Sequence, residues 1–326
     1  MRRGKATNIH RANLRGDDSY SLPLLESVPK TALPSKMIAR KRDSMTRYQL
    51  TLKEEFVRKN EILPGLCMFL LTYCLFLSTS DAQQISGHKA LAETQAIEQL
   101  VMANRILSNE GIFDHLGHVS VRNPSNPNTF FISRALAPDQ VTSTDIQELA
   151  LDGRVLKRGN LTPYSERIIH GAIYKARPDV NAVVHAHFPA ACIMANSGAA
   201  FRPVIHQAAI FLEGVPVYDE YDFTTPGSTG FLVTTQGEAD RVARRLDRKR
   251  ALFMVAHGCV VVGDIIPSAI NAAITLRDNI VVQLGSEQAG QPKYMTEAQS
   301  KHMIPLLVSG QERAWNYYVN RLKKAD

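Results

Sequence analysis

The sequence motif that decides the fold is Asn181-Ala182-Val183-Val184-His185-Ala186-His187. Its β-branched valines favour a strand, and the Pro178-Asp179 pair before it marks the end of another element. On a strand, residues i and i+2 point to the same face, so His185 and His187 present two imidazoles side by side. Neutral imidazole is a good ligand for zinc, manganese and iron, and we predict that this pair binds one divalent metal. The alternative is a hydrogen-bonded histidine pair on a half-buried strand.

Upstream of the motif, the pattern predicts a helix that carries an acidic residue at its start. Thr162-Pro163-Tyr164-Ser165-Glu166 opens this helix, which we expect to be capped by Thr162 or Ser165 and to end before Pro178. Glu166 then lies in the first turn, where the helix dipole favours a carboxylate.

Downstream of the motif, the apolar run Ala251–Ala256 ends in His257-Gly258 and indicates a buried strand. Gly258 allows another backbone to approach closely, so His257 is a candidate third ligand. Three protein ligands with open positions are typical of a catalytic metal. A thiolate ligand from Cys259 is an alternative, but three histidines already account for the site, and we interpret Cys259 as a buried thiol.

The order of these motifs resembles the class II aldolase/adducin family over roughly residues 88–290. The resemblance rests on Ser165-Glu166, on the spacing from Glu166 to His185-x-His187, and on the distant His257-Gly258. It implies one divalent metal per chain, zinc or manganese in preference to iron. By position the ligands would be His185, His187, His257 and Glu166, with Glu166 as the catalytic acid or base. Family enzymes are commonly fourfold-symmetric tetramers, so it also implies a homotetramer with sites at subunit interfaces.

The remaining pattern predicts an α/β fold, namely a three-layer α/β/α domain with a mixed, largely antiparallel central sheet. Helices flank a run of short strands, and Asp152-Gly153 indicates a hairpin between two of them. We expect helices at His88–Asn109, Gln236–Asp247, Ile266–Leu284 and Glu297–Arg321. We expect a loop that enters a strand within Asp114–Arg122, and further strands that include Thr129–Ser133 and Phe231–Thr234.

Composition separates the N-terminal part of the chain from the rest. Residues 1–82 contain 14 Lys and Arg against 8 Asp and Glu, so they carry +6 of the +7 formal charge. Residues 83–326 are therefore nearly neutral, and we expect no nucleic-acid partner. We assign residues 83–326 to the aldolase/adducin-like domain.

The N-terminal residues divide into two segments. Residues 1–44 are polar and without periodicity, and they are either disordered or untranslated sequence before a true start at Met45. Residues 45–82 combine basic residues, an apolar run and the small-x-small site Ser80-Asp81-Ala82, which is typical of a secretory signal. We predict cleavage before Gln83, export to the periplasm or exterior, and no stable membrane span afterwards. The alternatives are a buried helix or an uncleaved anchor, and without a real signal the protein would be cytoplasmic.

Three loops suggest the substrate. Sugar-phosphate members of the family hold phosphate with Gly-Asn, Thr-Gly and Ser-Ser, where this chain has Gly117-His118, Ser133-Arg134 and Tyr164-Ser165. Arginine pairs with a carboxylate bidentately, so these places favour a carboxylate substrate bound by His118, Arg134, Tyr164 and Ser165. The loops 115–122 and 134–141 resemble the branch that contains decarboxylases of hydroxylated aromatic or pyridine carboxylic acids. In the alternative, Arg134 forms an internal ion pair and His118 caps a turn.

Together these features predict a divalent-metal-dependent carbon–carbon lyase that acts through a metal-stabilised enolate. The favoured reaction is decarboxylation of a hydroxylated aromatic carboxylic acid. A sugar-phosphate aldolase or epimerase of the same family is the first alternative. A non-catalytic, adducin-like interaction module is the second.

Overall fold

The structure is a computed structural model that describes residues 64–325 apart from 225 and 227, with side chains described from residue 87 to residue 322. The contacts divide the chain into Met1–Leu75 and Phe76–Asp326. Of the first unit only the helical residues 64–75 are described. The predictions for residues 1–44 and for most of the 45–82 segment therefore lie outside the described residues. Within the described part of the chain, no helix combines the length and the apolar character that a membrane span needs.

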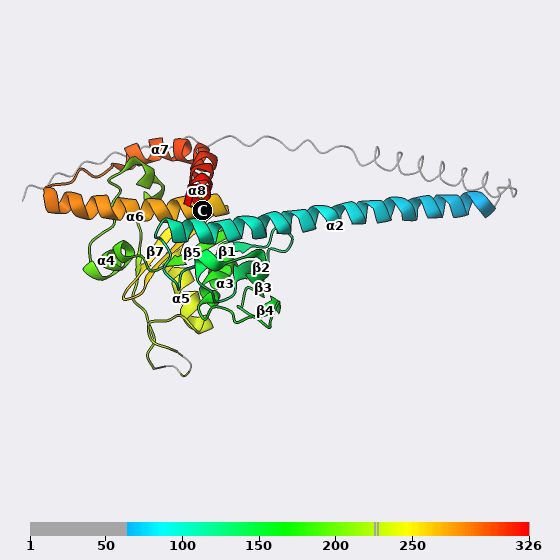
Figure 1. Ribbon diagram of the computed structural model, residues 1–326, viewed down its shortest axis with the longest axis horizontal. Helices are drawn as coiled ribbons and strands as arrows, with labels where there is room; N and C mark the ends of the chain where they lie inside the picture. Colours follow the sequence, from blue (N-terminus) through cyan, green and yellow to red (C-terminus); the bar gives the residue numbers. More distant parts are fainter. Residues whose placement is uncertain (1–63, 225, 227, 326) are drawn as a thin grey trace, which may run out of the picture. The chain divides into compact units, whose positions relative to one another are not determined.

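The second unit is built on one eight-stranded sheet with the order β4-β3-β2-β1-β5-β8-β7-β6 (Figure 1). Every neighbouring pair is antiparallel except β6 and β7, which are parallel. This confirms the predicted mixed, largely antiparallel sheet. The strands are β1 His118–Arg122, β2 Thr129–Ser133, β3 Ile146–Ala150, β4 Val155–Lys157, β5 Ala182–Ala186, β6 Val217–Tyr218, β7 Ala251–Met254 and β8 Gly258–Gly263.

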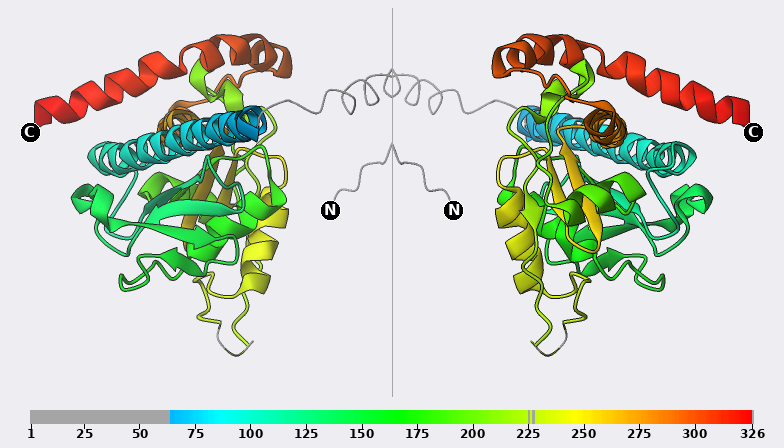
Figure 2. Two further views of the ribbon diagram at one scale, coloured as in Figure 1. Left: turned by 90° about the vertical axis from the view of Figure 1, so that its right-hand side faces the viewer. Right: turned by 90° about the vertical axis from the view of Figure 1, so that its left-hand side faces the viewer.

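Helices cover both faces of the sheet (Figures 1 and 2). They are α2 Pro64–Asn109, α3 Arg167–Ala176, α4 Pro189–Ser197, α5 Gln236–Leu246, α6 Ile266–Ala289, α7 Glu297–Ser309 and α8 Gln311–Ala325. Short 3₁₀ turns occur at Pro138–Gln140, Ser143–Asp145 and His206–Phe211.

Two apolar cores, one on each face, fix the layers. Residues of α2, α4 and α6 pack with Ala182, Val184 and Ala186 of β5, whereas residues of α3 and α5 pack with Val183. Because side chains alternate along a strand, the odd-numbered residues of β5 face α3. His185 therefore points toward the α3 side of the sheet, while Val119 and Val121 of β1 point away from it.

Several predicted details are wrong, including the start of the helix expected at His88–Asn109, since α2 begins at Pro64. The helix expected at Glu297–Arg321 is two helices, because the chain breaks at Gly310 between α7 and α8. Glu166 itself is the N-cap residue of α3, and no side-chain cap hydrogen bond forms there. The segment 231–234 forms only an isolated bridge between Thr229 and Leu232, since the backbone N–H of Val233 donates to Glu166 instead of to a neighbouring strand.

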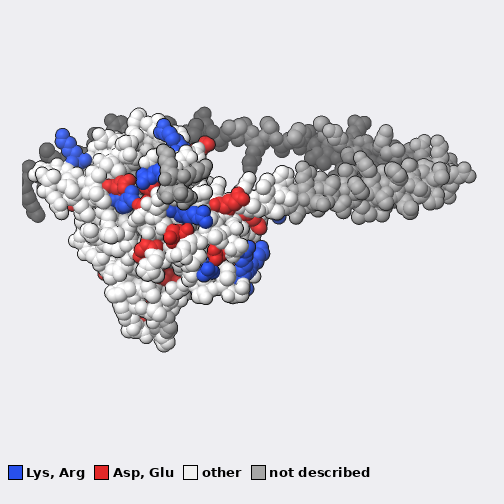
Figure 3. All heavy atoms as spheres, in the orientation of Figure 1, with Lys and Arg blue, Asp and Glu red and all other residues white. Residues whose placement is uncertain are grey.

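Figure 3 shows charged side chains on one face of the molecule. On the described part of this face, Lys and Arg are interspersed with Asp and Glu, without an extended patch of one sign. Nucleic-acid surfaces are typically basic patches or stripes. This face does not show that pattern, and the absence of a nucleic-acid partner stays a prediction.

Candidate metal centre

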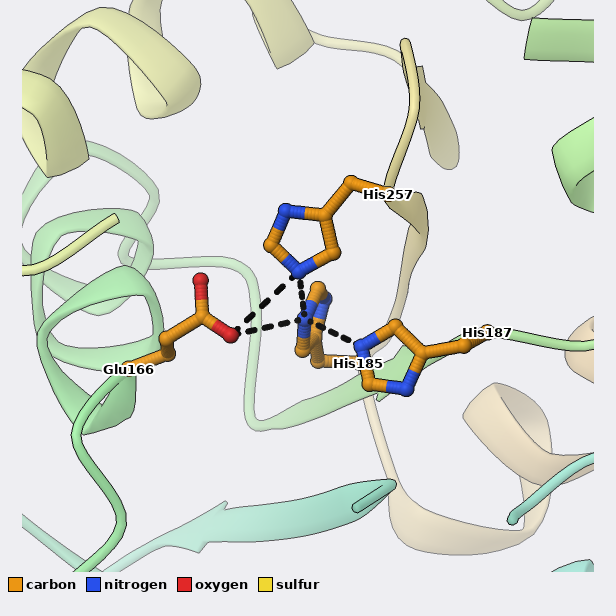
Figure 4. A group of neighbouring side chains, drawn as sticks. All are labelled: Glu166, His185, His187 and His257. Atoms are coloured by element: carbon orange, nitrogen blue, oxygen red, sulfur yellow. Dashed lines mark hydrogen bonds and ion pairs between the residues drawn. The ribbon is translucent and has the colours of Figure 1, made fainter. Parts of the chain in front are cut away.

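The four predicted metal ligands lie together. Glu166, His185, His187 and His257 each offer one ligand atom, and these atoms are all within 4.8 Å of one another (Figure 4). Glu166 precedes α3, His185 and His187 lie at the end of β5, and His257 lies in the turn from β7 to β8. The antiparallel pairing of β5 with β8 brings the end of one strand beside the start of the other.

The distances suit ligands of a single ion. His185 Nε2 lies 3.1 Å from Nε2 of His187 and 3.1 Å from Nε2 of His257. Oε2 of Glu166 lies 3.5 Å from His185 Nε2 and 3.3 Å from His257 Nε2. Donor atoms bound at ~2.1 Å to one ion, with bond angles of roughly 90–110°, are separated by roughly 3.0–3.5 Å.

The second nitrogen of two of these rings shows that the cluster fits a cation. His185 Nδ1 lies 3.1 Å from the backbone oxygen of Cys259, and His187 Nδ1 lies 3.3 Å from Oδ1 of Asp114. Both oxygens only accept, so both rings carry their proton on Nδ1 and present a bare Nε2. Two Nε2 lone pairs that face each other repel, and a divalent ion between them would turn this repulsion into two bonds.

Burial and charge support the same conclusion. The side chains of His185, His257 and Glu166 are at most 7% exposed, whereas His187 is 14% exposed, so the cluster opens on the His187 side. Burial and the neighbouring His185 lower the pKa of His187 to about 4, although Asp114 opposes the shift. At neutral pH the His187 ring is uncharged, as a metal ligand must be.

Glu166 is fixed by both of its oxygens. Oε1 accepts a hydrogen bond of 2.8 Å from the backbone N–H of Val233, and Oε2 faces the imidazoles. Burial alone would raise the pKa of Glu166, but the interactions with His185 and His257 outweigh it and hold the pKa well below its ordinary value. The carboxyl group is therefore ionised, which suits a metal ligand.

Gly258 explains the His-Gly pair in the sequence. A Cβ atom at this position would collide with the backbone oxygen of Ala186 and would lie 3.0 Å from Cα of His187. Only glycine lets β8 approach β5 this closely at the point where the histidines meet. The preceding Ala256 has a φ of 52°, so His257 is carried by a tight turn.

The four predicted substrate residues have different surroundings. His118 lies opposite His185 in the β1–β5 pair, with ring centroids 5.1 Å apart. The ring of Tyr164 packs against His118 at 4.4 Å, and its hydroxyl donates to the backbone oxygen of Leu136 at 2.6 Å. Ser165 is exposed, and nothing in the described residues brings it into the cluster.

Arg134 forms an ion pair within the chain. Its Nε donates to Oδ1 of Asp145 at 2.7 Å, and its side chain is 34% exposed. The structure therefore contains the internal ion pair of Arg134 that the sequence offered as the alternative to substrate binding. The structure contains no substrate, so the proposed contact of the outer guanidinium nitrogens with a carboxylate stays a prediction.

Sequence reasoning missed several residues that orient the site. Asp114 faces His187, the Val233 amide holds Glu166, and His170 bonds to His118 at 2.7 Å. Asp114 and Val233 lie in loops whose positions depend on tertiary packing. His170 had a local signal, because it lies one turn after Glu166 on the same helix.

Comparison with known proteins identifies the family of the chain. Residues 98–284 match the family model described as Class II Aldolase and Adducin N-terminal domain. The chain belongs to this family. Decarboxylase tropJ of Talaromyces stipitatus is 28% identical over 198 residues, which cover 57% of this chain and 74% of that protein. The 3,4-dihydroxyphthalate decarboxylase of Arthrobacter keyseri is 26% identical over 201 residues, or 57% of this chain and 76% of that one.

Among solved structures, the L-fuculose 1-phosphate aldolase from Glaciozyma antarctica superposes with a TM-score of 0.61 at 26% identity. The match covers 72% of this chain and 90% of the aldolase. The relatives of this family member thus include both decarboxylases and a sugar-phosphate aldolase. The three-layer class II aldolase fold is confirmed. The residues of the substrate loops bear on the choice between these reactions.

Proposed function

We propose that this protein is a divalent-metal-dependent carbon–carbon lyase that decarboxylates a hydroxylated aromatic carboxylic acid. The observation that carries the proposal is the convergence of three imidazole nitrogens and one carboxylate oxygen in a mostly buried cluster that opens at His187. A fold does not require four such groups at one point, so they indicate chemistry. Similarity to two decarboxylases supports the reaction class.

His185, His187, His257 and Glu166 would hold the cation. A divalent cation supplies Lewis-acid stabilisation of negative charge on substrate oxygens. Glu166 is ionised, so it would first accept a proton, namely that of the substrate hydroxyl, and later return one to the carbon that loses its carboxyl group. Once that carbon is protonated, the carbon–carbon bond breaks, carbon dioxide leaves, and the electron pair of the broken bond restores the aromatic ring.

The substrate class rests on the side chains that face the cluster. The buried ring of His118 lies against His185, the buried ring of Tyr164 lies against His118, and the two rings form an aromatic wall. A planar aromatic acid packs well against such a wall. A phosphate dianion gains nothing from it and needs several polar donors instead. The proposed substrate therefore carries a ring, a hydroxyl group and a carboxylate.

The test of substrate class is a side-by-side assay of hydroxyaromatic carboxylates and of fuculose- or ribulose-type phosphates, with carbon dioxide release as one readout. We expect turnover of a hydroxyaromatic carboxylate. Efficient turnover of a sugar phosphate would instead favour the aldolase or epimerase alternative, which similarity to the fuculose phosphate aldolase supports.

Arg134 is tested in the same assay. Arg134→Lys keeps the charge but loses the planar fork, so it should weaken substrate use by ~1–3 kcal/mol. Asp145→Asn is the matched control, because it breaks the internal ion pair and leaves the guanidinium in place. If both variants lower only the melting temperature and leave kcat/KM unchanged, Arg134 has a structural role.

A measurement of metal content distinguishes the proposed lyase from the non-catalytic, adducin-like alternative. A non-catalytic interaction module has no need of the ion, whereas the proposed lyase binds about one per chain. Elemental analysis of purified protein decides between them, since protein that contains no metal and takes none up would contradict the lyase.

A further inference from the structure

Four buried polar side chains form a hydrogen-bonded chain beside the metal ligands. Tyr174 Oη lies 2.7 Å from Ser120 Oγ, Ser120 Oγ lies 2.6 Å from His170 Nδ1, and His170 Nε2 lies 2.7 Å from His118 Nδ1. All four residues are at most 2% exposed. Ser120 and His118 lie on the face of β1 opposite to Val119 and Val121, so the chain crosses from α3 to the sheet.

The protons of this chain have one arrangement in which every donor between two of its members has an acceptor. The phenol of Tyr174 is neutral, because burial raises its pKa. Among the described residues, Ser120 Oγ is then the acceptor for the phenol proton. The Ser120 hydroxyl is left to donate to His170 Nδ1, and a ring that accepts at Nδ1 carries its proton on Nε2.

The same reasoning fixes the next ring. His170 Nε2–H donates to His118 Nδ1, so a neutral His118 carries its proton on Nε2. Burial lowers the pKa of His170 to about 3, so this ring is neutral. An imidazolium at His118 would point an N–H at the N–H of His170, so His118 accepts at Nδ1. In the reverse arrangement each donor would point the other way, and the phenol proton would be buried without an acceptor.

We propose that Tyr174, Ser120 and His170 hold His118 as the Nε2–H tautomer, a neutral hydrogen-bond donor directed at a substrate oxygen beside the metal ligands. Nε2 of His118 has no hydrogen-bond partner among the described residues, while the ring lies against His185 and Tyr164. His118 is therefore a specificity residue that recognises an acceptor oxygen, and His170 is a positioning residue that acts through it.

The oxygen bound by His118 would be a carboxylate or phenolate oxygen of the substrate, and this assignment rests on the proposed function. The tautomer itself does not depend on that function. A neutral donor adds direction without adding charge, so it stabilises an oxygen only where the oxygen lies in line with the N–H bond. This property would distinguish substrates that place an oxygen there from those that do not.

The tautomer is measured by two-bond ¹H–¹⁵N correlation spectra of the metal-free full chain labelled with ¹⁵N-histidine. His118 signals are assigned from their loss in His118→Gln. We expect the pattern of a neutral ring protonated at Nε2. Protonation at Nδ1, or an imidazolium, would overturn the proposal.

Two variants test the chain itself. Ser120→Ala removes the link between Tyr174 and His170, and Tyr174→Phe removes the first donor while it keeps the aromatic volume. In either variant that folds, the His118 signals should shift toward a mixture of both tautomers. Ser300→Ala is the control, because Ser300 is buried in α7 and its hydroxyl has no partner among the described residues. An unchanged Nε2–H pattern in both chain variants would overturn the role of the chain.

Activity provides the second readout. His170→Phe removes both hydrogen bonds and keeps a ring beside Phe130, with which His170 is stacked. We expect unchanged metal content and a fall in kcat/KM of about 10-fold, the scale of one charged hydrogen bond. A fall in metal content would mean that His170 supports the metal ligands instead. If wild type turns over no carboxylate, the proposed function fails, whereas the tautomer measurement still stands.

Discussion

The three histidines of the metal-ligand cluster differ in the hydrogen-bond partner of their Nδ1 atom. His185 is oriented by the Cys259 carbonyl and His187 by Asp114, whereas His257 Nδ1 is buried without a partner among the described residues. Oriented imidazoles bind metal better, because the ring does not have to be immobilised on binding. His185 and His187 are therefore the preorganised pair, and His257 completes the set.

Loss of one imidazole should remove most of the metal. His185→Ala and His257→Ala each take one of three nitrogen donors, and we expect the metal content to fall from about one per chain to a small fraction. His206→Ala is the matched control, because His206 is exposed in a 3₁₀ turn outside the cluster. Unchanged metal content in both cluster variants would refute the assignment.

Glu166 combines two proposed roles that one substitution separates. Glu166→Gln is isosteric and keeps an oxygen that can accept from the Val233 amide, so the fold and much of the metal should remain. Turnover should fall by ~10²-fold or more, as expected for a lost acid or base. Retained turnover, measured as kcat in the decarboxylation assay, would leave Glu166 only as a ligand.

Among the elements, the end of β5 and the start of β8 decide the geometry of the centre. The two strands touch at Gly258, where the backbone of Ala186 leaves no room for a Cβ atom. A side chain here would separate the strands that carry the histidines. Overpacking of this kind costs typically ~1–3 kcal/mol of stability.

Gly258→Ala should therefore weaken the metal centre without touching a ligand. We expect metal affinity to fall by roughly 10–100-fold, comparable to the loss of groups that orient ligands. Titration with a competing chelator measures this. Gly285→Ala in α6 is the control, because a Cβ atom there meets nothing within 4 Å and alanine favours a helix. Equal affinities for the two variants would mean that the close approach at Gly258 has no influence on the site.

The elements also show how far sequence reasoning reaches. The β-branched valines predicted the strand Ala182–Ala186. The alternation of side chains along a strand predicted the shared face of His185 and His187. Both signals are local properties of the sequence. The cap of α3 was wrong because the carboxylate of Glu166 is drawn to the imidazoles rather than to its own helix. The contacts of Asp114 and Val233 depend on loops folded against distant strands, and nothing in the local pattern encodes such packing.

On the scale of the whole molecule, the proposed metal would join three segments that lie far apart in the sequence. Glu166, the end of β5 and the β7–β8 turn meet only in the folded chain. A ligand that binds only the folded state stabilises it by mass action. Free metal at 1,000 times its dissociation constant should add ~4.1 kcal/mol to the free energy of unfolding.

Denaturant titrations with and without chelator check this prediction. The chelated protein should unfold at lower denaturant concentration, and the difference should vanish in His185→Ala. Equal midpoints with and without chelator in wild-type protein would show that the ion contributes nothing to the folded state.

Both edges of the eight-stranded sheet are short. β4 (Val155–Lys157) ends in a lysine that pairs with Glu148, and β6 (Val217–Tyr218) has its Val217 carbonyl occupied by Arg245. Long unprotected edge strands can pair with a strand of another molecule, whereas these short edges have few backbone groups available for such pairing. The predicted homotetramer, if it forms, must therefore meet through helices and loops rather than through a continuous intersubunit sheet. The same two edges protect the folded chain against fibrillar aggregation.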